Sequence, residues 1–224
     1  MKCNGGSVFT KHKGFQVMTI RSKSNIATLI VAVITLASLG AGDAASVVRA
    51  QGGVRGSRLV ARAEAVTGDR FTVAVATPSG VRVVARTPPG AETLRAIDSG
   101  LAELFAIARR NGYRARLNHA DYTVFIARAD RTRDSGGAYS PDIALGAAQY
   151  AGSVYDQGGY VYAAGLVLSS QPCAFVIAEH DRDFQRIANV VRYEGEHLVL
   201  YHNDRRRYEE TADHSRGGSH PILQ

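Results

Sequence analysis

The chain has 224 residues, a formal net charge of +7 and only two cysteines. This length allows a leader and one domain with ample core for independent folding. Cys3 lies at the start of the chain and Cys173 is alone in the remainder, so a disulfide framework is excluded for the folded part.

The first fifty residues predict a signal peptide or an N-terminal anchor. Basic residues from Lys2 to Lys23 precede an apolar run at 26–39, and small residues lead to Ala50. A positive stretch, a short apolar run and a small-x-Ala end are the parts of a secretory signal peptide. The apolar run is shorter than the roughly twenty residues that span a bilayer. We therefore expect cleavage near Ala50 and a secreted or periplasmic product, with an uncleaved anchor as the alternative.

Much of the positive charge belongs to this leader. It holds six of the 27 basic and one of the 20 acidic residues, which leaves 21 against 19 in the remainder. The one dense basic run beyond it is Arg205-Arg206-Arg207, which we interpret as a solvated helix end. Nucleic acid is therefore not an expected partner. A membrane is expected to be contacted only through an uncleaved leader, and no pattern indicates the oligomeric state.

Residues 51–57 predict a flexible linker, and residues 58–224 are expected to form a single domain with a histidine-rich C-terminal tail. Alternating apolar residues and turn signals predict strands, whereas apolar residues at helical spacing predict helices. The expected elements are strands at 59–65, 71–76 and 81–85, a helix at about 91–111, a strand at 122–127, a hairpin of strands at 143–150 and 161–168, a strand at 173–178, and a helix at about 183–204. This order predicts an α+β fold, in which two main helices pack on an antiparallel or mixed sheet.

The last of these helices carries ionisable side chains along one stripe. Tyr193 and His197 share a face one turn apart, and Asp204 returns to that face two turns beyond His197. Glu194 lies about 60° from His197 on the helical wheel. A carboxylate, an imidazole and a second carboxylate are therefore expected in one row.

This stripe resembles the active-site helix of zincin metallopeptidases, whose signature is His-Glu-x-x-His. The five positions here are Tyr193-Glu194-Gly195-Glu196-His197, so the second and fifth match and tyrosine replaces the first histidine. The resemblance implies that His197 binds zinc and that Glu194 is the general base. The order of strands and helices is also similar to the N-terminal part of a zincin domain. In that family, the strand before the helix is an edge strand that binds extended peptide. Glu194-x-x-His197 also has the spacing found in di-iron carboxylate proteins.

The tail adds further candidate ligands, because four of the seven histidines fall between positions 197 and 220. Gly217-Gly218 separates the last two histidines and would let the tail fold back onto the helix. Asp204, His202, His214 and His220 compete as partners of His197 in a metal site, although His202, like Glu196, is expected to point away from the stripe. The alternative is that His214 and His220 only cap or pack a C-terminal loop.

Two functions remain open at this point. The first is a secreted, metal-dependent hydrolase of the peptidase type, with a possible Zn²⁺, Glu194 as general base, Tyr193 stabilising developing charge, and a peptide or protein as substrate. The second is a non-catalytic envelope or extracellular binding domain, in which the Glu-His-Asp stripe is a hydrogen-bonded structural lock.

Overall fold

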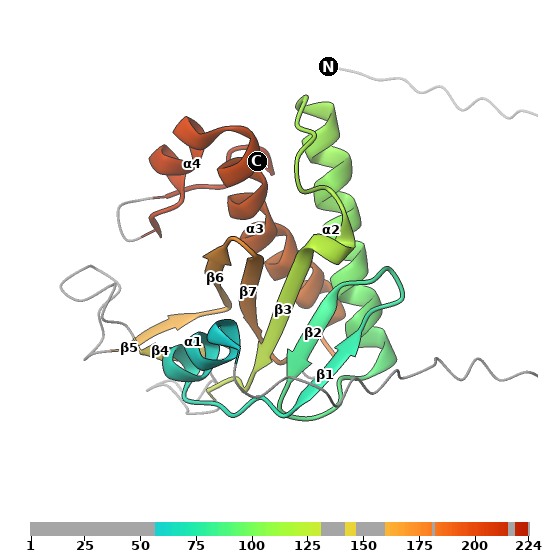
Figure 1. The fold of residues 1–224 in the computed structure, drawn as a ribbon, viewed down its shortest axis with the longest axis vertical. Helices are drawn as coiled ribbons and strands as arrows, with labels where there is room; N and C mark the ends of the chain where they lie inside the picture. Colours follow the sequence, from blue (N-terminus) through green and yellow to red (C-terminus); the bar gives the residue numbers. More distant parts are fainter. Residues whose placement is uncertain (1–56, 131–141, 147–159, 181, 215–217, 224) are drawn as a thin grey trace, which may run out of the picture. The chain divides into compact units, whose positions relative to one another are not determined.

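The computed structural model describes residues 57–130, 142–146, 160–180, 182–214 and 218–223 (Figure 1). The predicted leader, most of the linker and the tip of the predicted hairpin lie outside these ranges. The elements in chain order are α1 (Arg58–Thr67), β1 (Val73–Ala76), β2 (Arg82–Ala85), α2 (Ala91–Arg110), a 3₁₀ turn (His119–Asp121), β3 (Tyr122–Ala127), β4 (Ile143–Gly146), β5 (Tyr160–Ala163), β6 (Gly165–Ser170), β7 (Cys173–Ala178), α3 (Phe184–Asn203) and α4 (Arg205–Thr211). None of the described helices combines the length and apolar character needed to cross a membrane.

Five strands form one mixed sheet in the order β1-β2-β3-β7-β6. The three inner strands β2, β3 and β7 run parallel, and the two edge strands β1 and β6 are antiparallel to their neighbours. Strands β4 and β5 form a separate antiparallel pair. The prediction of an α+β fold with a mixed sheet is therefore confirmed.

Each face of the central sheet has its own apolar core. Successive side chains of a strand point to opposite faces, so Val124 and Phe175 pack with α2 and α3, whereas Phe125 and Val176 pack with α1 and the β4–β5 pair. Figure 1 shows α2 and α3 behind the sheet and α1 in front of it. Strands β3 and β7 are buried on both faces, which explains why they are apolar almost throughout.

Helices α2 and α3 pack closely against each other at two glycines. A Cβ atom added to Gly100 of α2 would lie 2.5 Å from the backbone oxygen of Ala188, and one added to Gly195 of α3 would lie 2.7 Å from Leu104 Cδ2. Only glycine fits these two positions without a shift of the neighbouring atoms. The contact fixes the position of α3, and Gly195 lies directly between the two glutamates of the predicted stripe.

The predicted strand at 59–65 is wrong, because this segment forms helix α1. Ser57 caps the helix start by accepting a hydrogen bond from Val60 N at 3.2 Å. Gly68 ends the helix with φ of +71°, a conformation that glycine adopts without strain. Val60 and Ala63 are buried one turn apart, so helical spacing prevails over the apparent alternation.

The predicted hairpin forms, but its second strand is divided. Residues 143–146 and 160–163 pair as β4 and β5. After Ala164 the chain enters β6, which pairs with β7 in the main sheet instead. The segment predicted as one strand at 161–168 therefore links the two sheets.

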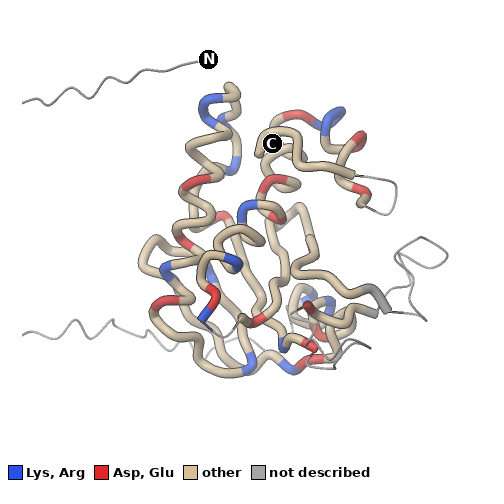
Figure 2. The backbone as a smooth tube through the Cα atoms, turned by 180° about the vertical axis from the view of Figure 1, so that it is seen from behind, with Lys and Arg blue, Asp and Glu red and all other residues tan. Residues whose placement is uncertain are grey.

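The chain after α3 also differs from prediction. Asp204 has φ of −146° and ends α3, and its side chain caps α4 by accepting from Arg207 N. The arginine run 205–207 therefore begins a helix, where cations oppose the helix dipole. Arg205 and Arg206 pair with Glu209 and Glu210 one turn further along, and basic and acidic positions follow one another along α4 in Figure 2.

Candidate metal centre

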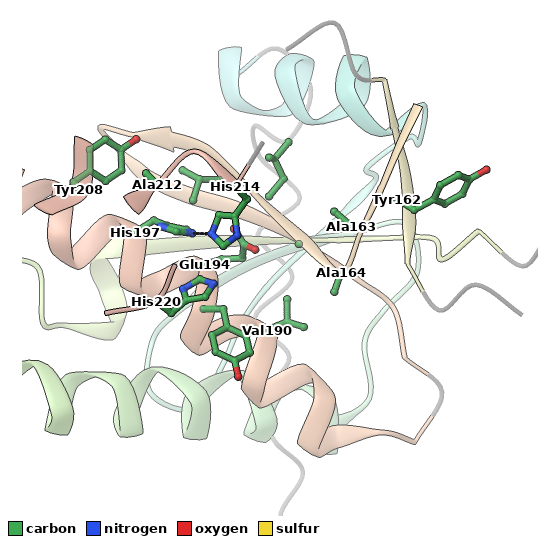
Figure 3. A pocket seen from close by; sticks show the side chains of 14 residues that line it. Tyr162, Ala163, Ala164, Val190, Glu194, His197, Tyr208, Ala212, His214 and His220 are labelled. Atoms are coloured by element: carbon green, nitrogen blue, oxygen red, sulfur yellow. Dashed lines mark hydrogen bonds between the residues drawn. The ribbon is translucent and has the colours of Figure 1, made fainter. Parts of the chain in front are cut away.

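Three histidines meet beside α3. His197 projects from α3, whereas His214 and His220 come from the tail that follows α4 (Figure 3). One ligand nitrogen of each ring lies within 4.8 Å of the others, and the Nε2 atoms of His197 and His214 are 3.1 Å apart. Two nitrogens that bind one tetrahedral metal at about 2.0–2.1 Å are about 3.3–3.4 Å apart. The His197–His214 separation is therefore close to that of two ligands of one ion, and the three histidines are near enough together that they could hold a metal ion.

Folding of the tail brings the two distant histidines into place. Two backbone hydrogen bonds of 3.1 Å return the chain, from Gly218 N to Asp213 O and from Ser219 N to Thr211 O. A Cβ atom on Gly218 would lie 2.4 Å from Thr211 O, so this return requires glycine. The prediction that the tail folds back and presents imidazoles to the helix is confirmed for His214 and His220.

Glu196 supports this cluster, although sequence reasoning expected it to point elsewhere. Its carboxylate is fully buried and accepts two hydrogen bonds, from His220 Nδ1 at 2.9 Å and from the backbone N–H of Ile222 at 2.7 Å. Its partner His220 also packs against the rings of Tyr193 and His197, so the returning tail links Glu196 to the Tyr193–His197 face. The helical wheel contained no information on the path of the tail, so this residue was missed as part of the site.

The surroundings of His197 keep its ring neutral. Burial and, to a smaller extent, the neighbouring rings of His220 and His214 lower the pKa of His197 to about 3. Its Nδ1 is buried and has no hydrogen-bond partner within the described part of the chain. Burial and His220 also lower the pKa of His214, against the opposing effect of Asp213 and Glu196. Neutral imidazoles are the form that binds metal ions.

Glu194 lies in the same cavity as the three histidines. The cavity has a volume of about 270 Å³ and is lined by residues of β5, β6, α3, α4 and the tail. Burial raises the pKa of Glu194 to about 8. Its side chain packs on β6 at Gly165, where an added Cβ would lie 2.7 Å from Glu194 Cγ. The predicted proximity of Glu194 and His197 is therefore present, and both side chains border one cavity.

Two of the predicted ligands lie outside the cluster. Asp204 is beyond the end of α3, where it caps α4 and lies 3.3 Å from the Tyr113 hydroxyl. The helical wheel does not apply to Asp204, because the helix ends at Asn203. His202 Nε2 makes a 2.9 Å hydrogen bond with Ser170 O and lies 3.5 Å from Cys173 Sγ. The structure therefore does not assemble the predicted Glu-His-Asp stripe as one unit.

Tyr193 lies beside the histidine cluster, at the edge of the cavity. The Tyr193 ring packs on the His220 ring with 4.6 Å between centroids, and 39% of the residue is exposed at the cavity. Tyr193 thus contacts a candidate ligand through its ring, at the position where zincins have their first histidine.

Cys173 is buried in β7, and burial raises the pKa of its thiol to about 11, which suits an inert core residue.

Comparison of the chain with protein-family models, with curated proteins and with solved structures found no match in any of the three. The zincin-like order of elements is therefore not confirmed, and the resemblance to zincins depends on the sequence of α3.

Proposed function

We propose that the protein is a metal-dependent hydrolase in which His197, His214 and His220 hold a zinc ion and Glu194 is the general base. The observation that carries the proposal is the meeting of three imidazoles and one carboxyl group at a single cavity. The ligand set differs from that expected from the motif, because two of the three ligands come from the tail.

Three neutral histidines with an open fourth position form a ligand set of catalytic zinc sites, and imidazole suits zinc better than it suits magnesium or calcium. A zinc ion held there would lower the pKa of its bound water toward neutrality. The cavity on the side of Glu194 leaves room for this water and for a substrate group.

Glu194 is suited to move a proton at this place. Burial raises its pKa to about 8 in the metal-free protein, and a nearby cation would favour the carboxylate form again. A carboxyl group whose pKa lies near the working pH can take a proton from water and return it to a leaving group.

The cavity wall is compatible with a peptide or protein substrate. Gly165, Leu166 and Val167 of β6 line it, together with Val190 of α3. Strand β6 is an edge of the main sheet, so one side of its backbone has no strand partner within the described residues. An extended peptide can add to such an edge through main-chain hydrogen bonds.

A second function is supported by a separate observation. Glu196 holds His220 and Ile222 by hydrogen bonds that require no metal ion. In a non-catalytic envelope or extracellular binding domain, these contacts alone would lock the tail onto α3.

Metal analysis and two variants separate the two functions. In a hydrolase, His197→Ala loses both zinc and activity, because it removes a ligand. Glu194→Gln retains one equivalent of zinc and loses most of the rate of hydrolysis, because it removes proton transfer and preserves shape. Glu210→Gln, an exposed change on α4, is the matched control and retains both. A parent protein that binds no zinc after metal-free purification and reloading would refute the hydrolase and favour the lock.

A further inference from the structure

Glu196 is the most completely buried carboxylate of the described residues, with no exposed surface. Its two oxygens have different partners, Oε2 with the His220 ring and Oε1 with the backbone N–H of Ile222. Both partners belong to the tail, and both donate. A buried carboxylate is tolerated when its oxygens are hydrogen-bonded in this way.

The bond to the ring determines which nitrogen of His220 remains free. A neutral imidazole carries one N–H donor and one acceptor nitrogen. Since a carboxylate only accepts, the proton of His220 resides on Nδ1, and Nε2 keeps its lone pair. The His220 ring lies 4.8 Å, between centroids, from each of the other two imidazoles, so its Nε2 is the atom available to the shared metal site.

We propose that Glu196 is a positioning residue of the metal centre, which fixes the tautomer of His220 so that Nε2 binds the ion. It also anchors the tail segment that carries this ligand through Ile222. Metal-binding histidines commonly donate their second N–H to a carboxylate, and loss of that carboxylate weakens metal binding by about 10–100-fold. The inference rests on the metal site of the proposed function, and it does not require hydrolysis.

Glutamine cannot replace this carboxylate, because each of its two polar atoms has one role. The amide oxygen can accept from Ile222 N–H or from His220, and the amide N–H₂ then faces the other donor. If the oxygen remains with Ile222, the ring must turn or place its proton on Nε2, where it blocks the metal. Glu196→Gln therefore changes the ligand while it keeps the volume of the side chain.

A purely structural role would give a different pattern from a positioning role. Ile222 is 7% exposed and packs in the core beside α2 and α3. Ile222→Ala loosens the tail through lost packing and leaves both bonds to Glu196 in place. It is the control for tail docking, and Glu210→Gln is the control for loss of a surface carboxylate.

The test measures zinc affinity by competition with a chromogenic chelator, thermal stability without zinc, and the His220 tautomer by ¹H–¹⁵N NMR of histidine-labelled protein. We expect Glu196→Gln to bind zinc about 10–100-fold more weakly and to lose the Nδ1–H signature of His220. We expect Ile222→Ala to melt at a lower temperature, to keep the Nδ1–H tautomer of His220, and to lose less zinc affinity than Glu196→Gln, whereas Glu210→Gln should match the parent in all three measurements.

The spectrum of the zinc-bound parent tests the inference even if Glu196→Gln fails to fold, since zinc on Nδ1 of His220 would overturn it. Unchanged zinc affinity in a folded Glu196→Gln variant would also overturn it and would leave the zinc site intact. A parent that binds no zinc would refute the metal centre and the inference together. A parent that binds zinc without hydrolysing any peptide would refute only the catalytic proposal.

Discussion

Glu194→Gln should remove a pH dependence from the stability of the metal-free protein. The pKa of Glu194 rises from 4.5 to about 8 on folding, because the carboxyl group is buried. Between these two values the folded chain holds a proton that the unfolded chain has released. The free energy of unfolding therefore falls as the pH rises through this window. Glutamine cannot ionise, so the variant should show no such fall.

The difference in unfolding free energy between the parent and Glu194→Gln above pH 6.5 isolates this effect. The pKa of His197 falls from 6.5 to about 3 on folding. Below pH 6.5, His197 is therefore protonated in the unfolded chain but remains neutral in the folded protein. This lowers stability toward acid pH, and His214 acts in the same direction. Above pH 6.5 the histidine effect fades over about one pH unit, and it cancels in the difference between the parent and Glu194→Gln, which retains both histidines. The remaining 1.5 pH units to about 8, at about 1.36 kcal/mol each, give a loss of about 2 kcal/mol at most.

Denaturant unfolding at intervals between pH 6.5 and 8.5 measures this loss on chelator-treated protein. A change of 2 kcal/mol is readily detected, because the total stability of a domain is about 5–15 kcal/mol. Glu210→Gln, which removes an exposed carboxylate, should retain the fall of the parent. Added zinc should reduce the fall, since a nearby cation lowers the pKa of Glu194. A difference in stability between the parent and Glu194→Gln that stays constant over this range would refute the reasoning.

Three further outcomes test the packing and the site. Gly100→Ala should lower the free energy of unfolding by about 1–3 kcal/mol or more, because its Cβ would meet a backbone oxygen of α3. Gly90→Ala, which has open space around it but replaces the N-cap residue of α2, should lower it by less in the same denaturant assay. Gly165→Ala should displace the Glu194 side chain, so that zinc content stays at the parent level while the rate of hydrolysis falls; an unchanged rate would contradict the placement of the base. Replacement of His214 and His220 together by alanine should abolish zinc binding and leave the far-UV circular dichroism spectrum intact, and retained zinc would exclude the tail as the source of ligands.

The sequence determined the elements whose apolar pattern is strong. Strands β3 and β7 have the predicted bounds, because continuous apolar runs between turn signals leave little choice. Helices α2 and α3 begin and end within one residue of prediction. Short segments were predicted less accurately. The alternation at 59–65 predicted a strand, but the caps at Ser57 and Gly68 bound a helix there. No local signal in the sequence predicted that the chain passes from one sheet to the other at Ala164.

Part of the candidate site could likewise be predicted from the sequence, and part of it could not. Glu194 and His197 are three residues apart on one helix, so local geometry alone predicted that they would share a cavity. The selection of His214 and His220 over Asp204 and His202 required the tertiary structure. It depends on where α3 ends and on how the tail returns across it, which are set by contacts between residues far apart in the chain. Glu196 shows this most clearly, because the side chain that the wheel directs away from the stripe is the one that holds the returning tail.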